Sequence, residues 1–272
     1  MMKEEMVKAV NAAIEAGKEI LTVYKTDDFE IETKGDQSPL TRADRNAHHL
    51  IMRKLESTGY PVLSEEGKEM DYDKRKVWPR YWCVDPLDGT KEFIKRNGEF
   101  TVNIALIEDR IAAHGVIYVP VTQELYVGIR GLGAWKMTAV DPDYRASSLE
   151  DLFKQGQKLP YQPAINKPFV AVGSRSHMND QTREIIASFE KKYGETKVIS
   201  RGSSLKLCMV AEGKADIYPR FAPTMEWDTA AGQAIAQAAG MLVTTADMVT
   251  PLLYNKQELL NPWFVVRKKG VN

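Results

Sequence analysis

The stretch Asp85-Pro86-Leu87-Asp88-Gly89-Thr90 guides the interpretation of the rest of the chain. Pro86 fixes its own φ and favours an extended backbone at Asp85, so a strand over 81–84 should deliver Asp85 at its end. Gly89 has no Cβ, which lets neighbouring N–H groups approach an anion closely. Two carboxylates beside such a turn suit the binding of a divalent metal together with phosphate. Asp, Pro and Gly are also common turn residues, so the stretch alone is compatible with an ordinary strand-to-turn boundary.

Composition limits the classes of partner. The 272 residues contain 37 Lys plus Arg and 37 Asp plus Glu, so no overall charge attracts a nucleic acid polymer or a membrane surface. Cys83 and Cys208 lie in hydrophobic contexts and are predicted to be buried thiols of a reducing compartment. No hydrophobic run has the length of a membrane span, and the first residues lack the pattern of a signal peptide. We therefore expect a cytoplasmic protein without an integral membrane segment, and peripheral attachment to the inner membrane stays open.

Hydrophobic periodicity predicts an α/β protein. Hydrophobic residues recur at helical spacing over 6–24, and a second helix is predicted over 43–55. Short strands then follow at 61–63, 81–84, 102–107, 115–119 and 125–127. Residues 138–167 have weak periodicity and are interpreted as a connection between two halves. Beyond them strands and helices alternate, with strands at 169–172, 197–200, 216–218 and 241–244 and helices over 180–193, 203–212 and 228–239.

Acidic residues fall where predicted elements begin or end. Glu65 and Glu66 follow the strand at 61–63, Asp85 and Asp88 follow the strand at 81–84, and Asp228 opens a helix. In an α/β fold such carboxylates can converge on one crevice. Oxygen ligands alone favour Mg²⁺ or Mn²⁺ over zinc. Each position also has a purely structural interpretation, because Asp228 is a good N-cap and the glutamates could lie in a solvated turn.

Asp44 has the spacing of a helix cap. It follows Thr41 by three residues at the start of the second predicted helix, as in a capping box with Asp in place of Glu. Taken by itself, this pair is interpreted as structural.

The second half carries a local basic cluster. A histidine follows the strand at 169–172, a Gly-Ser-Ser sequence leads into the helix predicted over 203–212, and an arginine closes the strand at 216–218. Free N–H groups at the start of a helix favour an anion, and residues three apart share a helix face. A solvated side chain is the alternative for each of these residues, most of all for the histidine. The candidates for anion binding are His177, Ser203, Lys206 and Arg220.

Three of these segments together resemble the signatures of the inositol monophosphatase superfamily. They are Glu65-Glu66, the hexapeptide at 85–90, and Trp227-Asp228-Thr229-Ala230-Ala231-Gly232. The resemblance extends from residue 34 to the end of the last strand, and the run at 91–101 is similar to the bacterial 3′(2′),5′-bisphosphate nucleotidase branch. It implies a layered αβαβα sandwich and a metal-dependent, lithium-sensitive phosphatase. The substrate it implies is adenosine 3′,5′-bisphosphate, which would be hydrolysed to AMP and phosphate.

The resemblance also implies roles for individual residues. Two or three Mg²⁺ ions would be held by the side chains of Glu65, Asp85, Asp88 and Asp228 and by the backbone carbonyl of Leu87. Water would be the nucleophile, so no covalent intermediate is expected, and the catalytic residues would be Asp44, Thr90 and Glu65. Thr90 would hold the water, and Asp44 would accept a proton through its hydroxyl. The substrate would contact Gly89, Thr90, His177, Ser203, Lys206, Arg220 and Asp228.

The expected organisation is one compact catalytic unit of two halves. Residues 1–140 would carry most metal ligands, and residues 141–272 would carry the substrate-binding residues and the last ligand. An inositol or sugar phosphate monoesterase is the alternative activity, and a regulatory protein that keeps the fold is a third hypothesis. The number of ions, a homodimer, the role of Glu66 and the preference for the sulfated analogue of the nucleotide stay open.

Overall fold

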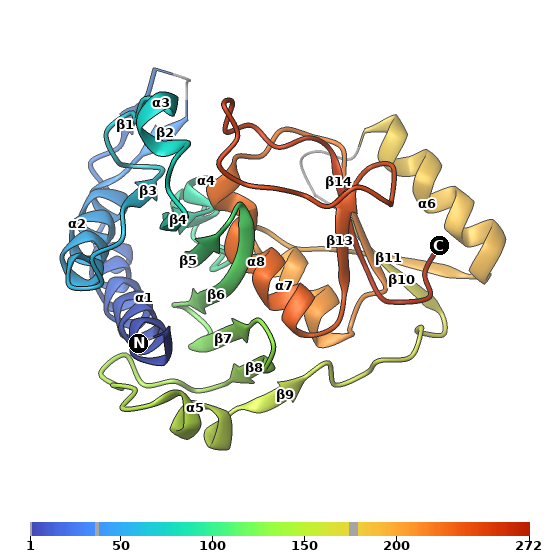
Figure 1. Ribbon diagram of the computed structural model, residues 1–272. Coiled ribbons are helices and arrows are strands. Elements are labelled where there is room, and N and C mark those ends of the chain that lie inside the picture. Colours follow the sequence, from blue (N-terminus) through green and yellow to red (C-terminus); the bar gives the residue numbers. More distant parts are fainter. Residues whose placement is uncertain (1, 36–37, 174–178) are drawn as a thin grey trace.

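The chain folds into five alternating layers of helices and sheets in a computed structural model that describes residues 2–35, 38–173 and 179–272 (Figure 1). Within these residues the strands form a seven-stranded sheet, a five-stranded sheet and a two-stranded ribbon. The ribbon pairs β1 (Glu32–Thr33) with β2 (Pro39–Leu40).

The seven-stranded sheet lies in the first half of the sequence. Its strands follow chain order from β3 to β9, and all neighbouring pairs are antiparallel except β3 and β4, which are parallel. The strands are β3 (Val62–Ser64), β4 (Arg80–Asp88), β5 (Thr101–Glu108), β6 (Ile111–Val119), β7 (Glu124–Ile129), β8 (Gly133–Met137) and β9 (Gln157–Leu159).

The five-stranded sheet has the order β11-β10-β12-β14-β13. Its first three strands are parallel, and β14 is antiparallel to both of its neighbours. The strands are β10 (Phe169–Gly173), β11 (Thr196–Ser200), β12 (Ile217–Arg220), β13 (Leu242–Thr245) and β14 (Phe264–Arg267).

Helices fill the remaining three layers. One outer layer packs on the seven-stranded sheet, a middle layer lies between the sheets, and the last covers the five-stranded sheet (Figure 1). In this order the helices are α1 (Met2–Tyr24) and α2 (Arg42–Glu56), α7 (Leu205–Glu212) and α8 (Glu226–Ala238), and α6 (Asp180–Tyr193). The short helices are α3 (Tyr72–Arg75), α4 (Thr90–Ile94) and α5 (Leu149–Gln155). The expected αβαβα sandwich is confirmed.

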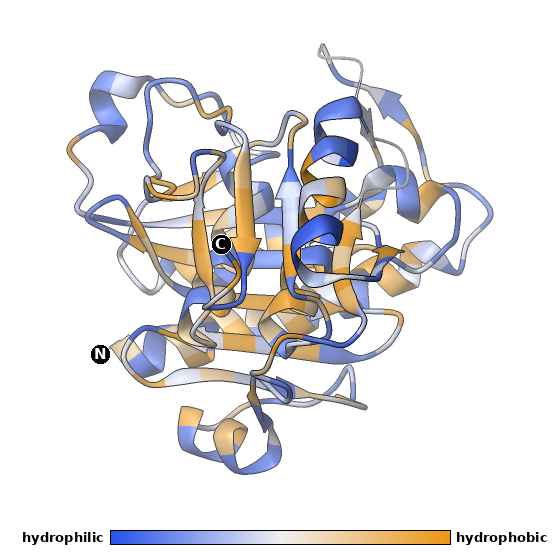
Figure 2. Ribbon diagram, turned by 90° about the vertical axis from the view of Figure 1, so that its right-hand side faces the viewer, coloured by the Kyte–Doolittle hydropathy of each residue, from blue (hydrophilic) through white to orange (hydrophobic). Residues whose placement is uncertain are grey.

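Side-chain alternation explains why the long sheet is covered on both faces. Trp82 and Val84 pack with α1 and α2, whereas Tyr81 and Cys83 pack with the middle helices. Successive side chains of a strand point to opposite faces, so a strand that is hydrophobic at every position needs a layer on each side. Figure 2 shows that the strands in the interior are largely hydrophobic, whereas hydrophilic residues are common on the outer loops and helices.

Two glycines bring α8 close to the long sheet. A Cβ added at Gly115 of β6 would lie 2.4 Å from the Ala231 carbonyl oxygen, and one at Gly128 of β7 would lie 2.5 Å from the Ile235 Cα. Neither distance is possible for a real Cβ, so glycine is required where the helix backbone contacts the strands. This close approach carries the first turn of α8 toward the end of β4.

The structure corrects several predicted boundaries. The strand at 81–84 extends through Asp88 as β4, with a register shift between Asp85 and Asp88. The segment 138–167, predicted as a connection, contains α5 and β9. Strands β1, β2, β8 and β14 were not predicted. The division into halves at residue 140 stays a prediction, and both cysteines are buried free thiols as expected.

Candidate active site

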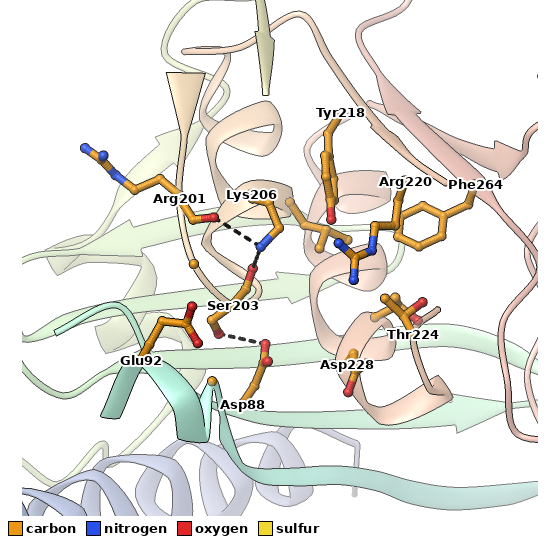
Figure 3. Close-up of a pocket in the computed structure, with 14 residues that line it drawn as sticks. Asp88, Glu92, Arg201, Ser203, Lys206, Tyr218, Arg220, Thr224, Asp228 and Phe264 are labelled. Carbon is orange, nitrogen blue, oxygen red and sulfur yellow. Dashed lines mark hydrogen bonds between the residues drawn. The ribbon is translucent and has the colours of Figure 1, made fainter. Parts of the chain in front are cut away.

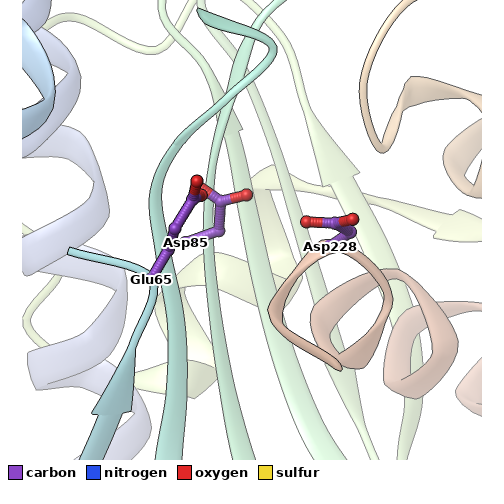
Figure 4. A group of neighbouring side chains, drawn as sticks. All are labelled: Glu65, Asp85 and Asp228. Atoms are coloured by element: carbon purple, nitrogen blue, oxygen red, sulfur yellow. The ribbon is translucent and has the colours of Figure 1, made fainter. Parts of the chain in front are cut away.

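Three carboxylates meet where β3, β4 and α8 come together. Because β3 and β4 are parallel, their carboxyl ends lie side by side, and the Glu65 N–H donates a hydrogen bond to the Val84 carbonyl at 3.1 Å. This pairing places Glu65 beside Asp85. Asp228 is the third residue of α8, and carboxylate oxygens of the three residues lie within 4.8 Å of one another (Figure 4).

The charges of this carboxylate cluster are poorly compensated. Burial raises the pKa of Asp85 well above its usual value, and the neighbouring charges of Glu65 and Asp88 raise it further. Burial likewise raises the pKa of Glu65, although the Lys34 ammonium lies 2.8 Å from it, and burial and Asp88 raise the pKa of Asp228. Converging carboxylates are stabilised when a cation lies between them. The donor set therefore fits a hard divalent cation held by oxygen ligands.

Asp88 lies beside that cluster, and its carboxylate is held by other partners. Its Oδ2 accepts hydrogen bonds from the hydroxyls of Ser203 at 2.7 Å and Ser204 at 2.6 Å, and from the Asn103 amide at 3.2 Å. The register shift in β4 pairs Asp85 with Asn103 and Asp88 with Thr101, so both aspartates lie on the same face of the sheet. Asp88 thereby ties the end of β4 to the loop before α7.

Asp44 and Thr90 form a second polar pair. The Thr90 hydroxyl donates a hydrogen bond to Asp44 Oδ1 at 3.1 Å. The other carboxylate oxygen of Asp44 accepts a bond from the Thr41 backbone N–H at 2.8 Å, in a capping box at the start of α2. Asp44 is 1% exposed, and this burial raises its pKa. Its capping role and its contact with Thr90 therefore coexist.

A pocket with cationic side chains opens next to Asp88 and Gly89 (Figure 3). Lys206 Nζ donates hydrogen bonds to the carbonyls of Ser203 at 2.6 Å and Arg201 at 3.2 Å. Burial lowers the pKa of Lys206 to about 8. Such a pocket provides positive charge for an anionic ligand in a chain without net charge.

Arg220 is placed on the other side of this pocket by β12. Its Nη2 donates a hydrogen bond to the Pro223 carbonyl at 3.0 Å, and its buried Nε has no partner among the described residues. A buried donor without a partner is costly and is compensated when a ligand accepts its bond. The guanidinium of Arg220 lines the pocket and adds a cation beside Lys206.

Comparison with known proteins identifies the family. The family model described as "Inositol monophosphatase family" matches residues 2–268. The chain belongs to the inositol monophosphatase family. Enzymes of this family are metal-dependent phosphatases, in agreement with the carboxylate cluster.

Several relatives belong to one branch of this family. The 3′(2′),5′-bisphosphate nucleotidases CysQ of Salmonella typhimurium and Escherichia coli K12 are each 44% identical, over 92% of this chain and 94% of theirs. The crystal structure of CysQ from Bacteroides thetaiotaomicron superposes with a TM-score of 0.89 at 53% identity, covering 98% and 97% of the two chains. The suhB structure from Bartonella henselae, 24% identical with a TM-score of 0.73, covers 98% and 94% and supports the fold alone.

The structure brings together most of the site residues predicted for a family member. Glu65, Asp85 and Asp228 meet directly. Leu87 is buried, and its N–H donates to Asp85 Oδ1 at 3.0 Å. The roles of these four residues and of Asp88 as metal ligands stay predictions. His177 lies outside the described residues.

The loop before α7 that carries Ser203 and Ser204, called the serine loop, differs from the prediction. The helix begins at Leu205, so Ser203 precedes it and has a positive φ of 53° instead of sharing a helix face with Lys206. Its hydroxyl donates to Asp88. Similarly, α8 begins at Glu226 and Asp228 is not its N-cap, although its carboxylate accepts the Met225 N–H at 2.8 Å.

Sequence analysis missed the residues that support this loop. Ser204 Oγ donates to Asp88 and accepts a hydrogen bond from the Asn103 amide at 2.8 Å. Thr101 Oγ1 lies 2.7 Å from Ser203 Oγ. The available signal was a pair of polar residues two apart, Thr101 and Asn103, at the start of an otherwise hydrophobic strand. Polar residues that share a face of a buried strand require partners there.

Lys34 was also missed, and it bears on Glu66. Its ammonium forms ion pairs with the carboxylates of both Glu65 and Glu66. Glu66 therefore lies at the edge of the carboxylate cluster, where it helps to hold the lysine. Separately, no helix in the described part of the chain has the length and hydrophobicity needed to cross a membrane.

Proposed function

We propose that the protein is a Mg²⁺-dependent 3′(2′),5′-bisphosphate nucleotidase that hydrolyses adenosine 3′,5′-bisphosphate to AMP and phosphate. The observation that carries the proposal is the adjacency of the Glu65–Asp85–Asp228 cluster and a pocket lined by Lys206 and Arg220. A substrate with two separate phosphates needs two such regions. The CysQ relatives, named for this activity, support the same substrate.

The carboxylates would hold the ions. Glu65, Asp85 and Asp228 would provide oxygen ligands for two or three Mg²⁺ ions, together with Asp88 and the Leu87 carbonyl. Bound there, Mg²⁺ would neutralise the phosphate and lower the pKa of the attacking water. The N–H groups of Gly89 and Thr90 would hold the phosphate that is removed.

Thr90 and Asp44 would accept the proton that the attacking water loses. The Thr90 hydroxyl donates to Asp44, so its lone pairs remain available to accept a hydrogen bond from water. When the water oxygen attacks phosphorus, its proton would pass to Thr90 Oγ1 while the Thr90 proton moves to Asp44 Oδ1. The bond between phosphorus and the 3′-oxygen breaks, and that oxygen is protonated from solvent to give AMP.

Lys206 and Arg220 would bind the second phosphate. Ser203 would support the same phosphate site, because its backbone carbonyl accepts a hydrogen bond from Lys206 Nζ. The sulfated analogue, 3′-phosphoadenylyl sulfate, has the same 3′-phosphate and is a second test substrate. A phosphate bound there would lie beside two cations that line one pocket.

A substrate panel tests the proposal. Phosphate release is measured on adenosine 3′,5′-bisphosphate, inositol 1-phosphate and fructose 1,6-bisphosphate, each with Mg²⁺ and with a chelator. The highest kcat/KM is expected for the nucleotide, with activity only in Mg²⁺. A clear preference for inositol 1-phosphate would refute the nucleotide assignment and leave the phosphatase chemistry intact.

A further inference from the structure

Glu92 is one of three carboxylates that line this pocket, and unlike Asp88 and Asp228 it is not among the proposed metal ligands. It is the third residue of α4, three positions after Gly89, and its side chain is half-buried and directed toward Ser203 (Figure 3). Its stem packs against the loop before α7, since a Cβ added at Gly202 would lie 2.9 Å from Glu92 Cγ. The side chain is thus a fixed part of the pocket wall.

This carboxylate has no hydrogen-bond or ion-pair partner within residues 2–35, 38–173 and 179–272. A glutamate at the third position of a helix often accepts the N–H of the capping residue, but Glu92 does not bond Gly89 in this way. Lys206 donates instead to two backbone carbonyls. By contrast, the nearby Glu99 is engaged by the Gly202 N–H at 2.7 Å.

The chemistry of the site restricts what Glu92 can bind. An ionised carboxylate only accepts hydrogen bonds, and it repels phosphate. Between the two phosphates of the proposed substrate lies the nucleoside, whose donors are a ribose hydroxyl and the exocyclic amino group of adenine. Glu92 is one helical turn from Gly89, which we assign to the phosphate that is removed. The ribose hydroxyl on the carbon next to that phosphate is therefore the nearer donor.

We propose that Glu92 is a specificity-determining residue that accepts a hydrogen bond from the nucleoside, at the ribose hydroxyl adjacent to the scissile phosphate. This assignment rests on the proposed function. It gives a role to the carboxylate of this anion-binding pocket that is not assigned to the ions. A polar group that is buried by the substrate also penalises any analogue that leaves it without a donor.

Three substrates and three variants test the assignment. The kcat/KM values of adenosine, 2′-deoxyadenosine and inosine 3′,5′-bisphosphates are compared in wild type, Glu92→Gln and Glu92→Ala. Glu56→Ala is the matched control, because Glu56 is exposed at the end of α2. Thermal unfolding of each variant shows that it is folded, and Gln preserves the shape of the side chain.

The wild type and the control are expected to prefer the ribonucleotide over the deoxynucleotide by about 10- to 100-fold, the scale of a hydrogen bond to a charged group. This ratio should fall to near one in Glu92→Ala and to an intermediate value in Glu92→Gln, with the adenosine-to-inosine ratio unchanged. If instead the Glu92 variants lose the preference for the adenosine over the inosine bisphosphate, the donor is the amino group of the base. That result would overturn the ribose contact. If both the ribonucleotide-to-deoxynucleotide ratio and the adenosine-to-inosine ratio equal the wild-type values in both variants, Glu92 has no role in specificity. A wild type inactive on the bisphosphate would fail the proposed function itself.

Discussion

Replacement of Lys206 by methionine tests how much stability the folded protein loses by keeping a charged ammonium group buried in the pocket. Lys206 is 8% exposed, and its ammonium is held by backbone carbonyls, with no ion pair to a carboxylate in the described residues. Burial disfavours the charged form and lowers its pKa from 10.5 to about 8. The folded protein therefore keeps a cation at neutral pH against a cost in stability.

The magnitude follows from the change in pKa. One pH unit corresponds to about 1.36 kcal/mol, so a fall from 10.5 to about 8 corresponds to roughly 3 kcal/mol. Between pH 8 and 10.5 the unfolded chain binds the Lys206 proton more often than the folded protein does. The free energy of unfolding should therefore rise with pH across this window, and the full destabilisation should be present below pH 8.

The assay is urea unfolding with a chelator present, at several pH values between about 7 and 11. The difference in unfolding free energy between wild type and Lys206→Met isolates this lysine, because other titrating groups are common to both proteins. We expect the difference to change by about 3 kcal/mol in favour of the wild type as pH rises. Lys25→Met, which removes an exposed lysine, is the control and should give curves parallel to the wild type. Parallel curves for Lys206→Met would refute the reasoning.

The same lysine predicts a pH dependence of activity. The wild-type kcat/KM on adenosine 3′,5′-bisphosphate should fall above about pH 8, as the free enzyme loses the Lys206 proton. Lys206→Arg keeps its charge and should remove this fall, whereas Lys206→Met should raise KM for the bisphosphate and leave hydrolysis of inositol 1-phosphate unchanged. If Lys206→Met loses activity equally on both substrates, Lys206 does not bind the second phosphate.

Three further predictions concern the chemistry. Asp85→Asn should lower kcat by at least about 100- to 1,000-fold with the fold preserved by circular dichroism, because it removes a central charge of the cluster; unchanged turnover would exclude the metal mechanism. Thr90→Ala should lower kcat by about 100-fold or more while Thr90→Ser keeps most activity, since only a hydroxyl can connect water to Asp44; equal rates in the two variants would rule out this relay. Mg²⁺ at 100 times its Kd should raise wild-type unfolding free energy by about 2.7 kcal/mol for each ion bound, with a much smaller rise in Asp85→Asn; equal rises in both proteins would show that the ions bind elsewhere.

Local sequence was enough to locate the carboxylate cluster. Glu65 and Asp85 follow hydrophobic runs, and carboxyl ends of parallel strands meet at one edge of a sheet. The position of Asp228 beside them depends on Gly115 and Gly128, which let α8 contact the strands. The approximate convergence was therefore predictable from strand ends, although the contact that achieves it was not.

The hydrogen bonds that support the serine loop could not be predicted from the sequence, for a physical reason. Ser203 adopts a positive φ, which local preferences disfavour for a residue with a Cβ. Its conformation is stabilised by hydrogen bonds to Asp88 and Thr101, which lie about a hundred positions away in the sequence. Helical periodicity extended α7 over this residue because it registers only neighbours on the same element. Tertiary contacts decided the boundary.

The two aspartates of the hexapeptide illustrate how one strand can serve both parts of the site. Both were predicted as metal ligands, and the register shift in β4 sets them on the same face of the sheet, where Asp85 lies beside Glu65 and Asp228 while Asp88 accepts hydrogen bonds from the serine loop. If Asp88 also binds an ion, its bonds to Ser203 and Ser204 must adjust, and these serines precede the helix that carries Lys206. The metal cluster and the pocket for the second phosphate are then linked through a single carboxylate. Such a link makes the binding of ions and of substrate mutually dependent, because a change in affinity at one site must appear equally at the other.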